Sequence, residues 1–143
     1  MPKITSLVAI ALLMIACQPE VDAPPTPERV DEEAIDDVWH KAKLRGVAFR
    51  AIGQEPGWLL EISNGEQILL VTDYGENRII LPYVEPVVFQ DERRTEYRLP
   101  DHNTIIEIRG EPCTDSMSGE RFAVTVSLVL PDTRLDGCGR ALF

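Results

Sequence analysis

The chain has 143 residues, enough for one folded domain together with a leader and a linker. Hydrophobic residues make up 44% of it and charged residues 27%, which is the balance of an ordinary globular protein. The formal net charge is −10, and because residues 1–16 carry Lys3 and no acid, the remainder is one unit more negative, at −11. Such a surface argues against binding to nucleic acid or to anionic lipid headgroups, and it favours a basic protein partner.

Residues 1–16 have the pattern of an export signal. Lys3 supplies a positive start, and 7–16 is an uninterrupted apolar run that is well short of the ~20 residues a transmembrane helix needs. The run ends LMIAC at 13–17, which resembles the lipobox of bacterial lipoproteins, whose cysteine receives diacylglycerol and then an acyl chain. We therefore predict a signal peptide over 1–16 and a lipid on Cys17. The alternative is a plain secretory leader that happens to end in cysteine.

The segment 17–27 is predicted to be a tether between the lipid and the folded domain. It contains four prolines and almost nothing apolar, so it cannot bury enough surface to fold. Gln18 follows the lipidated cysteine, where an aspartate would resemble the signal for retention in the inner membrane. The expected location is therefore the outer membrane, with the domain facing the periplasm.

Residues 28–45 are predicted to form an acidic helix. Acids crowd its first half and bases its end, an order that complements the helix macrodipole, and Gly46 can cap the C-terminus. A thin apolar stripe recurs every four residues and is widened by two neighbours: Val30, Ala34, Val38 and Ala42, with Ile35 and Trp39 beside them. The alternative is a disordered acidic linker that becomes ordered only near Trp39.

Residues 46–143 are predicted to form an all-β domain, because the apolar period changes from about 3.6 to 2 near residue 47. Alternation predicts strands over 47–52 and 58–63, and Asn64-Gly65 predicts a hairpin to a returning strand over 68–72. Further short runs separated by turn residues lie at 78–83, 86–90, 95–99, 104–109 and 122–130. Seven or eight short strands at this spacing indicate a small antiparallel β-barrel or sandwich.

Two cysteines remain once Cys17 is assigned to lipid. Cys113 and Cys138 predict one disulfide in an oxidising periplasm, closing a loop of 26 residues. Metal binding is the alternative, but His40 and His102 are the only histidines, and two distant cysteines make a poor zinc site. We expect neither a metal nor another cofactor.

Signals for an enzyme are weak. The chain contains no G-x-S-x-G elbow, phosphate-binding loop or dinucleotide fingerprint. Ser116 and Ser118 lie near Asp115, but neither histidine is close to them in sequence. A serine-dependent hydrolase that assembles its triad in space is therefore the least favoured function, and no catalytic residue is assigned.

Two clusters of polar and turn residues are the candidates for a site. The first is GQEPGW at 53–58, where Glu55 and Trp58 mark a motif turn whose structural alternative is a tight turn with Trp58 in the core. The second is the loop 114–120, with recognition candidates Asp115, Met117, Ser118 and Glu120. The alternative is a corner held by its own hydrogen bonds, with Met117 pointing inward.

Both clusters belong to a set of motifs that resembles a family of uncharacterised bacterial envelope lipoproteins. The matching stretches are RGV at 45–47, FRA at 49–51, QEPGW at 54–58, DYG at 73–75, CxDxMSG at 113–119 and GCG at 137–139. The resemblance implies a lipid-anchored envelope protein, and it supplies no assigned catalytic residues to carry over. Related domains joined to META domains point loosely to envelope stress.

A likeness of architecture alone links the chain to the membrane-bound inhibitors of c-type lysozyme, which are also small lipid-anchored β-barrels with a disulfide. Their inhibitory motif is not found in this sequence. The expected function is a non-enzymatic binding or structural role on a lipid tether. The alternative is inhibition of a basic enzyme such as lysozyme.

Overall fold

The computed structural model describes residues 32–143 of the chain, with side chains described from residue 38 onward. The expected signal peptide, the lipidated Cys17, the tether 17–27 and the start of the predicted helix lie outside these residues. Within the described part, no helix is long and apolar enough to cross a membrane. The described residues contain one α-helix, α1 (Glu32–Leu44), followed by strands.

Nine strands form one antiparallel sheet in the order β4-β3-β2-β1-β11-β10-β7-β6-β5. Two further strands, β8 and β9, form a separate hairpin, and two single turns of 3-10 helix, η1 (Asp73–Gly75) and η2 (Pro100–His102), lie between strands. The bounds are β1 (Phe49–Gly53), β2 (Trp58–Ser63), β3 (Gln67–Thr72), β4 (Asn77–Pro82), β5 (Val87–Phe89), β6 (Arg94–Leu99), β7 (Thr104–Arg109), β8 (Cys113–Thr114), β9 (Arg121–Phe122), β10 (Val124–Val129) and β11 (Arg134–Ala141).

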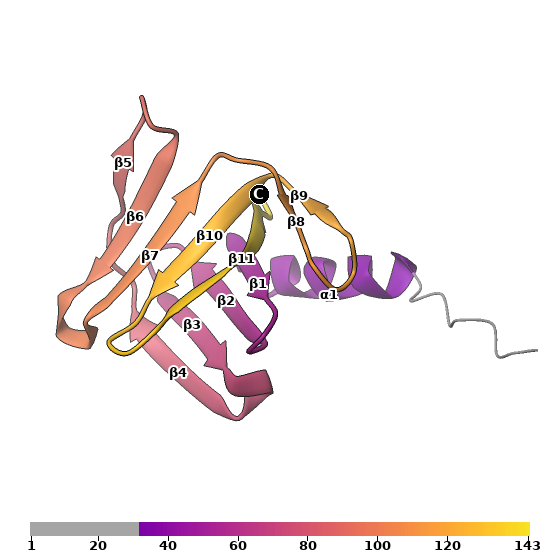
Figure 1. Cartoon of the computed structure of the whole chain (residues 1–143), viewed down its shortest axis with the longest axis horizontal. Coiled ribbons are helices and arrows are strands. Elements are labelled where there is room, and N and C mark those ends of the chain that lie inside the picture. The colour runs from indigo at the N-terminus through magenta and orange to yellow at the C-terminus, as the bar shows by residue number, and fades with distance from the viewer. Residues whose placement is uncertain (1–31) are drawn as a thin grey trace, which may run out of the picture.

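The sheet curls around its own apolar face, which forms the core (Figure 1). Side chains alternate across each strand, so one face collects the buried aliphatic residues, among them Leu60, Ile62, Ile68, Ile106 and Leu128. The all-β prediction is confirmed. A single nine-stranded sheet curled on itself lies closer to the predicted barrel than to the predicted sandwich.

The hairpin between β2 and β3 is confirmed, with a turn one residue longer than the Asn-Gly pair suggests. Ser63 pairs with Gln67, so Asn64, Gly65 and Glu66 form a three-residue loop. Gly65 has a φ of 73°, and the Glu66 N–H donates to the Ser63 carbonyl at 3.1 Å. A three-residue loop of this kind needs one left-handed position, and glycine supplies it without strain.

The sequence patterns miss β11, which occupies the centre of the sheet between β1 and β10. Glycines interrupt its alternation, and the reason is the ring of Trp58. A Cβ on Gly137 would lie 2.6 Å from the Trp58 ring and 2.2 Å from the Ile52 carbonyl oxygen, and a Cβ on Gly53 would also meet this ring. Strand β11 therefore has glycine in place of an apolar residue where Trp58, on β2 beyond the intervening β1, fills the core.

The predicted C-terminal cap of the helix is confirmed. Gly46 has a φ of 84°, its N–H donates to the Lys43 carbonyl at 2.9 Å, and the Val47 N–H donates to the Ala42 carbonyl at 3.2 Å. This is the paired bonding of a Schellman motif. The predicted apolar stripe is wrong at Val38, which is 45% exposed, because the helix packs through Trp39 and Ala42 instead.

Helix α1 docks on the outer face of the sheet beside the β8–β9 hairpin (Figure 1). The ring of Trp39 lies 5.4 Å from that of Phe122, and both belong to a small buried cluster with Cys138. The guanidinium of Arg140 lies 4.3 Å from the centre of the Trp39 ring, and that of Arg50 lies 5.2 Å from it. Trp39 therefore fixes the helix through both apolar and cation–π contacts.

The motifs at 45–47 and 49–51 lie where helix α1 meets the sheet. Arg45 and Arg50 both pair with the carboxylate of Glu61, which is buried on β2. Arg45 follows the helix and Arg50 lies on β1, so one carboxylate joins the helix end to the sheet. These two motifs therefore have a structural role.

Candidate functional site

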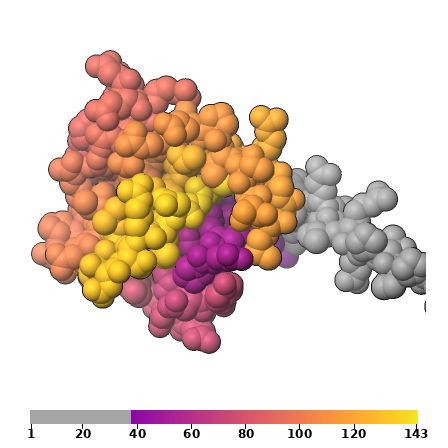
Figure 2. Space-filling view, in the orientation of Figure 1, coloured from indigo at the N-terminus to yellow at the C-terminus, as the bar shows by residue number. Residues whose placement is uncertain are grey.

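The remaining motifs, which are far apart in sequence, meet at one end of the outer face. We use the name motif surface for the turn 53–58, η1, the loop 114–120 and residues 136–138 of β11. Figure 2 shows the purple-magenta turn after β1, the yellow β11 and the orange β8–β9 hairpin bordering one another on one side of the molecule. Two recesses hollow this surface, and both are lined by Gly53 and Gln54.

The larger recess, here called the β8 groove, has a volume of about 370 Å³. It is lined by Gly53, Gln54, Cys113, Thr114, Asp115, Ser116, Thr125, Val126, Ser127, Asp136, Gly137 and Cys138. The second, here called the Tyr74 pocket, has a volume of about 310 Å³ and is lined by Ile52, Gly53, Gln54, Gly57, Trp58, Leu59, Val71, Tyr74 and Gly75. The turn 53–58 thus contributes to both.

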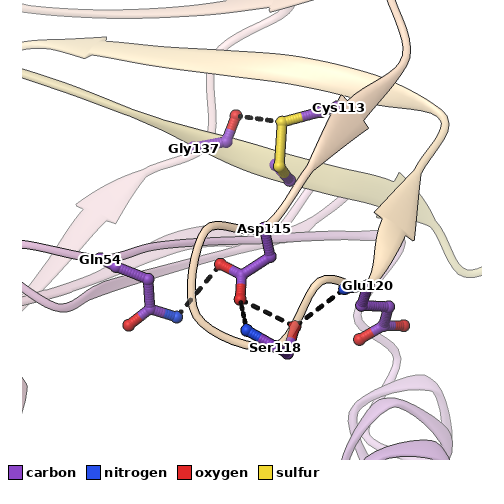
Figure 3. The surroundings of a disulfide bond; sticks show 7 residues. Gln54, Cys113, Asp115, Ser118, Glu120 and Gly137 are labelled. Atoms are coloured by element: carbon purple, nitrogen blue, oxygen red, sulfur yellow. Dashed lines mark hydrogen bonds between the residues drawn. A yellow bond between two sulfur atoms is a disulfide. The ribbon is translucent and has the colours of Figure 1, made fainter.

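The predicted disulfide is confirmed and anchors the β8–β9 hairpin to the sheet. Cys113 and Cys138 are bonded, with their Cα atoms 5.5 Å apart. Figure 3 shows the bond at the base of the loop, with the Cys113 sulfur near the Gly137 carbonyl. The loop 114–120 is therefore held at its base by a covalent bond to the central strand of the sheet.

Asp115 holds the loop from within. Its side chain is only 5% exposed, and its Oδ2 accepts hydrogen bonds from the backbone N–H and the hydroxyl of Ser118, both at 2.8 Å. Its Oδ1 accepts a bond from Gln54 Nε2 at 3.2 Å, which ties the loop to the turn 53–58 (Figure 3). This carboxylate therefore links the two sequence clusters directly.

The charge state of Asp115 follows from these bonds. Burial alone would raise the pKa of its carboxyl, but the donors of Ser118, Gln54 and the Met117 backbone together outweigh burial and lower the pKa below its ordinary value. Asp115 is therefore ionised at neutral pH. Its negative charge is stabilised by neutral donors.

The four recognition candidates of the loop take different roles. Asp115 points inward, Ser118 uses its hydroxyl to bond Asp115 and to accept from the Glu120 N–H at 3.1 Å, and Glu120 pairs with Arg140 at 3.1 Å. Met117 is 73% exposed. The alternative in which Met117 points inward is therefore wrong. The hydrogen bonds of Asp115 and Ser118 hold the loop from inside, and Met117 lies on its outer side.

In the motif turn, Trp58 is buried in the core, which agrees with the alternative that this turn has a structural role. Glu55 is exposed at the tip of the turn and has a φ of 58°. The residue that sequence reasoning missed is Gln54, which reaches from the turn to Asp115. Its contact is 61 positions away in sequence, and nothing in the local pattern distinguishes it from a solvent-exposed glutamine.

Tyr74 is the other residue of this surface that the sequence alone does not single out, although it lies in the DYG motif at 73–75. Its backbone is left-handed, with a φ of 56°, and its N–H donates to the Gly57 carbonyl at 2.9 Å. The ring packs on Gly57, where an added Cβ would lie 2.8 Å from it, yet Tyr74 remains 74% exposed. A bulky residue adopts positive φ only where its surroundings enforce it, so the backbone that carries this ring is held in place.

The two recesses differ in charge. Asp115 and Asp136 line the β8 groove, whereas no charged residue lines the Tyr74 pocket, and within the described residues no lysine, arginine or histidine lines either recess. Arg134 approaches from outside, where its Nε lies 3.2 Å from Asp136 Oδ1. The arrangement is complementary to a cationic group from a partner.

The motif surface contains serines but no histidine beside them. His40 lies in α1 and His102 in η2, so neither histidine lines the recesses beside Ser116 and Ser118. Among the described residues, no three metal-binding side chains gather in one place. Comparisons of the chain with protein-family models, curated proteins and solved structures gave no match.

Proposed function

We propose that this chain is a lipid-anchored envelope protein whose β domain binds a protein partner through the motif surface and catalyses no reaction. One observation carries the proposal: two large apolar side chains, Tyr74 and Met117, are displayed to solvent by tightly held backbone next to the two recesses. Isolated exposed apolar residues are common, but these two project from elements that the fold braces with a disulfide, a buried carboxylate and a left-handed turn.

A rigid backbone lowers the cost of binding, because little loop entropy remains to be lost when a partner docks. Aromatic residues are enriched among those that dominate binding energy, and methionine adapts its shape to a shallow pocket. Tyr74 and Met117 therefore supply the anchors of the interface. Hydroxyls and carboxylates around them supply its polar rim.

The membrane attachment rests on the leader pattern and on Cys17, followed by the proline-rich tether 17–27. A tether of this composition lets the domain reach a partner while it stays anchored. Together these features support a receptor-like or scaffolding role at the outer membrane, facing the periplasm.

Inhibition of a basic enzyme such as lysozyme is the second candidate. The observations that favour it are the net charge of the chain and, for the part of the chain that the structure describes, the absence of any basic side chain from the lining of both recesses. An inhibitor would use the same anchors, with the acids of the motif surface facing the basic surface of the enzyme.

Site-specific photo-crosslinking of the full chain in living cells tests the proposal. A benzoylphenylalanine placed at Met117 or at Tyr74 should capture the same protein, and the same group at Val88, an exposed residue of the edge strand β5, should not capture it. A captured muramidase would favour the inhibitor. No crosslink at Met117 and Tyr74, or an identical pattern from Val88, would contradict the proposed function.

A further inference from the structure

We infer that the partner enters the β8 groove as an extended polypeptide segment that lies beside β8 and directs a basic side chain toward Asp136. This inference rests on the proposed function and specifies how the partner is recognised. Three observations lead to it: a strand with an unused edge, a groove along that edge, and an acidic floor.

The first observation is the unused edge of β8. Within the described residues β8 pairs only with β9, with Cys113 opposite Phe122 and Thr114 opposite Arg121. The Asp115 N–H donates to the Glu120 carbonyl at 2.8 Å, so Asp115 and its alternate neighbour Cys113 face β9. Because bonding direction alternates along a strand, the N–H and C=O of Thr114 point away from β9.

The second observation is that the groove follows this edge. Four consecutive residues, 113–116, line it, whereas no residue of β9 does. The opposite wall consists of residues from the outer face of β10 and β11, namely Thr125, Ser127 and Asp136. These residues form the floor of the groove. A strand added beside Thr114 would therefore lie in the groove, with its main chain bonded to β8 and its side chains over this floor.

The third observation is the charge of the floor. The side chain of Asp136 is 66% exposed, and only its Oδ1 is engaged, by the Ser127 hydroxyl and by Arg134. Asp115 adds a second negative charge to the same lining, although its two oxygens already accept hydrogen bonds from Gln54 and Ser118. Alternate side chains of an added strand face the floor, so the chemistry fits a segment with lysine or arginine at every second position.

Fluorescence anisotropy with the purified full chain and synthetic octapeptides tests the inference. The probe alternates valine with lysine, and the matched peptide alternates valine with glutamate. We expect the lysine peptide to bind at least tenfold more tightly, with an affinity that falls as salt rises. Equal binding of the two peptides would overturn the inference.

Backbone methylation of the probe separates strand addition from simple charge attraction. In an extended strand, all valine N–H groups lie along one edge and all lysine N–H groups along the other. We expect N-methylation of one of these two sets to abolish binding and methylation of the other to be tolerated. Unchanged binding of both methylated peptides would show that no strand pairs with β8.

Variants of the protein locate the contact. Thr114→Pro removes an N–H that points away from β9, so the hairpin should survive and binding should fall about fivefold, the loss expected from one hydrogen bond. Asp136→Asn should weaken binding about as much, and Asp132→Asn, in the exposed turn before β11, should not. Full binding by both Thr114→Pro and Asp136→Asn would overturn the inference.

Failure of this inference can be told from failure of the proposed function. If a partner crosslinks at Met117 and Tyr74 and is still captured when Thr114→Pro and Asp136→Asn are introduced, the motif surface binds the partner by another geometry. If no partner crosslinks at those two positions, the proposed function itself is wrong.

Discussion

Replacing Asp115 by alanine is the strongest test of how the motif surface is built. The change removes an acceptor that serves Ser118 twice at 2.8 Å and Gln54 once at 3.2 Å, on a residue that is buried. A hydrogen bond to a charged group contributes about 1.5–3 kcal/mol. Part of this is regained because Ser118 is exposed and can bond water, so we expect a net loss of about 2–3 kcal/mol.

For a domain of this size such a loss lowers the melting temperature by about 8–12 °C. Thermal unfolding followed by circular dichroism measures it, with mass spectrometry confirming that the disulfide is intact. Asp115→Asn keeps an acceptor for Ser118 and should cost about 1 kcal/mol, and Asp132→Ala in an exposed turn should stay within about 0.5 kcal/mol. A fall of less than 2 °C for Asp115→Ala would refute this account of the loop.

The same variant has a pH signature. The folded-state pKa of Asp115 is lowered, so its ionised form stabilises the fold above the unfolded-state pKa of about 4, and this stabilisation disappears as the pH falls through the lower folded value. The difference in melting temperature between the wild type and Asp115→Ala should therefore be full at pH 7 and shrink below about pH 4. A difference that grows on acidification would contradict the lowered pKa.

Three other changes have definite expected outcomes. Cys17→Ser should abolish incorporation of labelled palmitate, and an unlabelled wild type would disprove lipidation. Cys113→Ser with Cys138→Ser should cost roughly 3.5 kcal/mol in denaturant unfolding, from the lost loop constraint, and an unchanged midpoint would count against a stabilising bond. Gly137→Ala forces a Cβ against backbone and should cost about 3 kcal/mol or prevent folding, whereas Gly110→Ala meets only the movable Arg93 side chain and should cost less than 1 kcal/mol in the same assay.

The sequence predicts most of the sheet because most of its strands alternate regularly. Strands β2, β3, β6, β7 and β10 each present alternate side chains to the core, and a period of two is a local signal. Strand β11 fails this test because its inner positions Gly137 and Gly139 make room for residues of other strands. Which glycine faces a tryptophan depends on the register between strands. The sequence pattern of a single strand carries no information about that register.

The candidate site also has a part that the sequence predicts and a part that depends on contacts between distant segments. The pairing of Cys113 with Cys138 follows from counting cysteines, and the loop 114–120 stands out by composition. The inward turn of Asp115 and its bond to Gln54 depend on where β8 lies on the outer face of the sheet. Tyr74 is similar, because its display depends on a left-handed turn packed on Gly57, a contact between two loops that the sequence separates.

The central place of β11 has a consequence for how the protein folds. Strands β1 to β4 form one run of neighbours, and β5, β6, β7 and β10 form another, and within the described sheet β11 is the strand that joins them. Each run consists of contacts between near neighbours in the chain, whereas β1 pairs with β11 across most of the domain, Phe49 opposite Ala141. Since distant pairings slow folding, we expect two quickly formed half-sheets and a late, rate-limiting closure in which β1 pairs with β11.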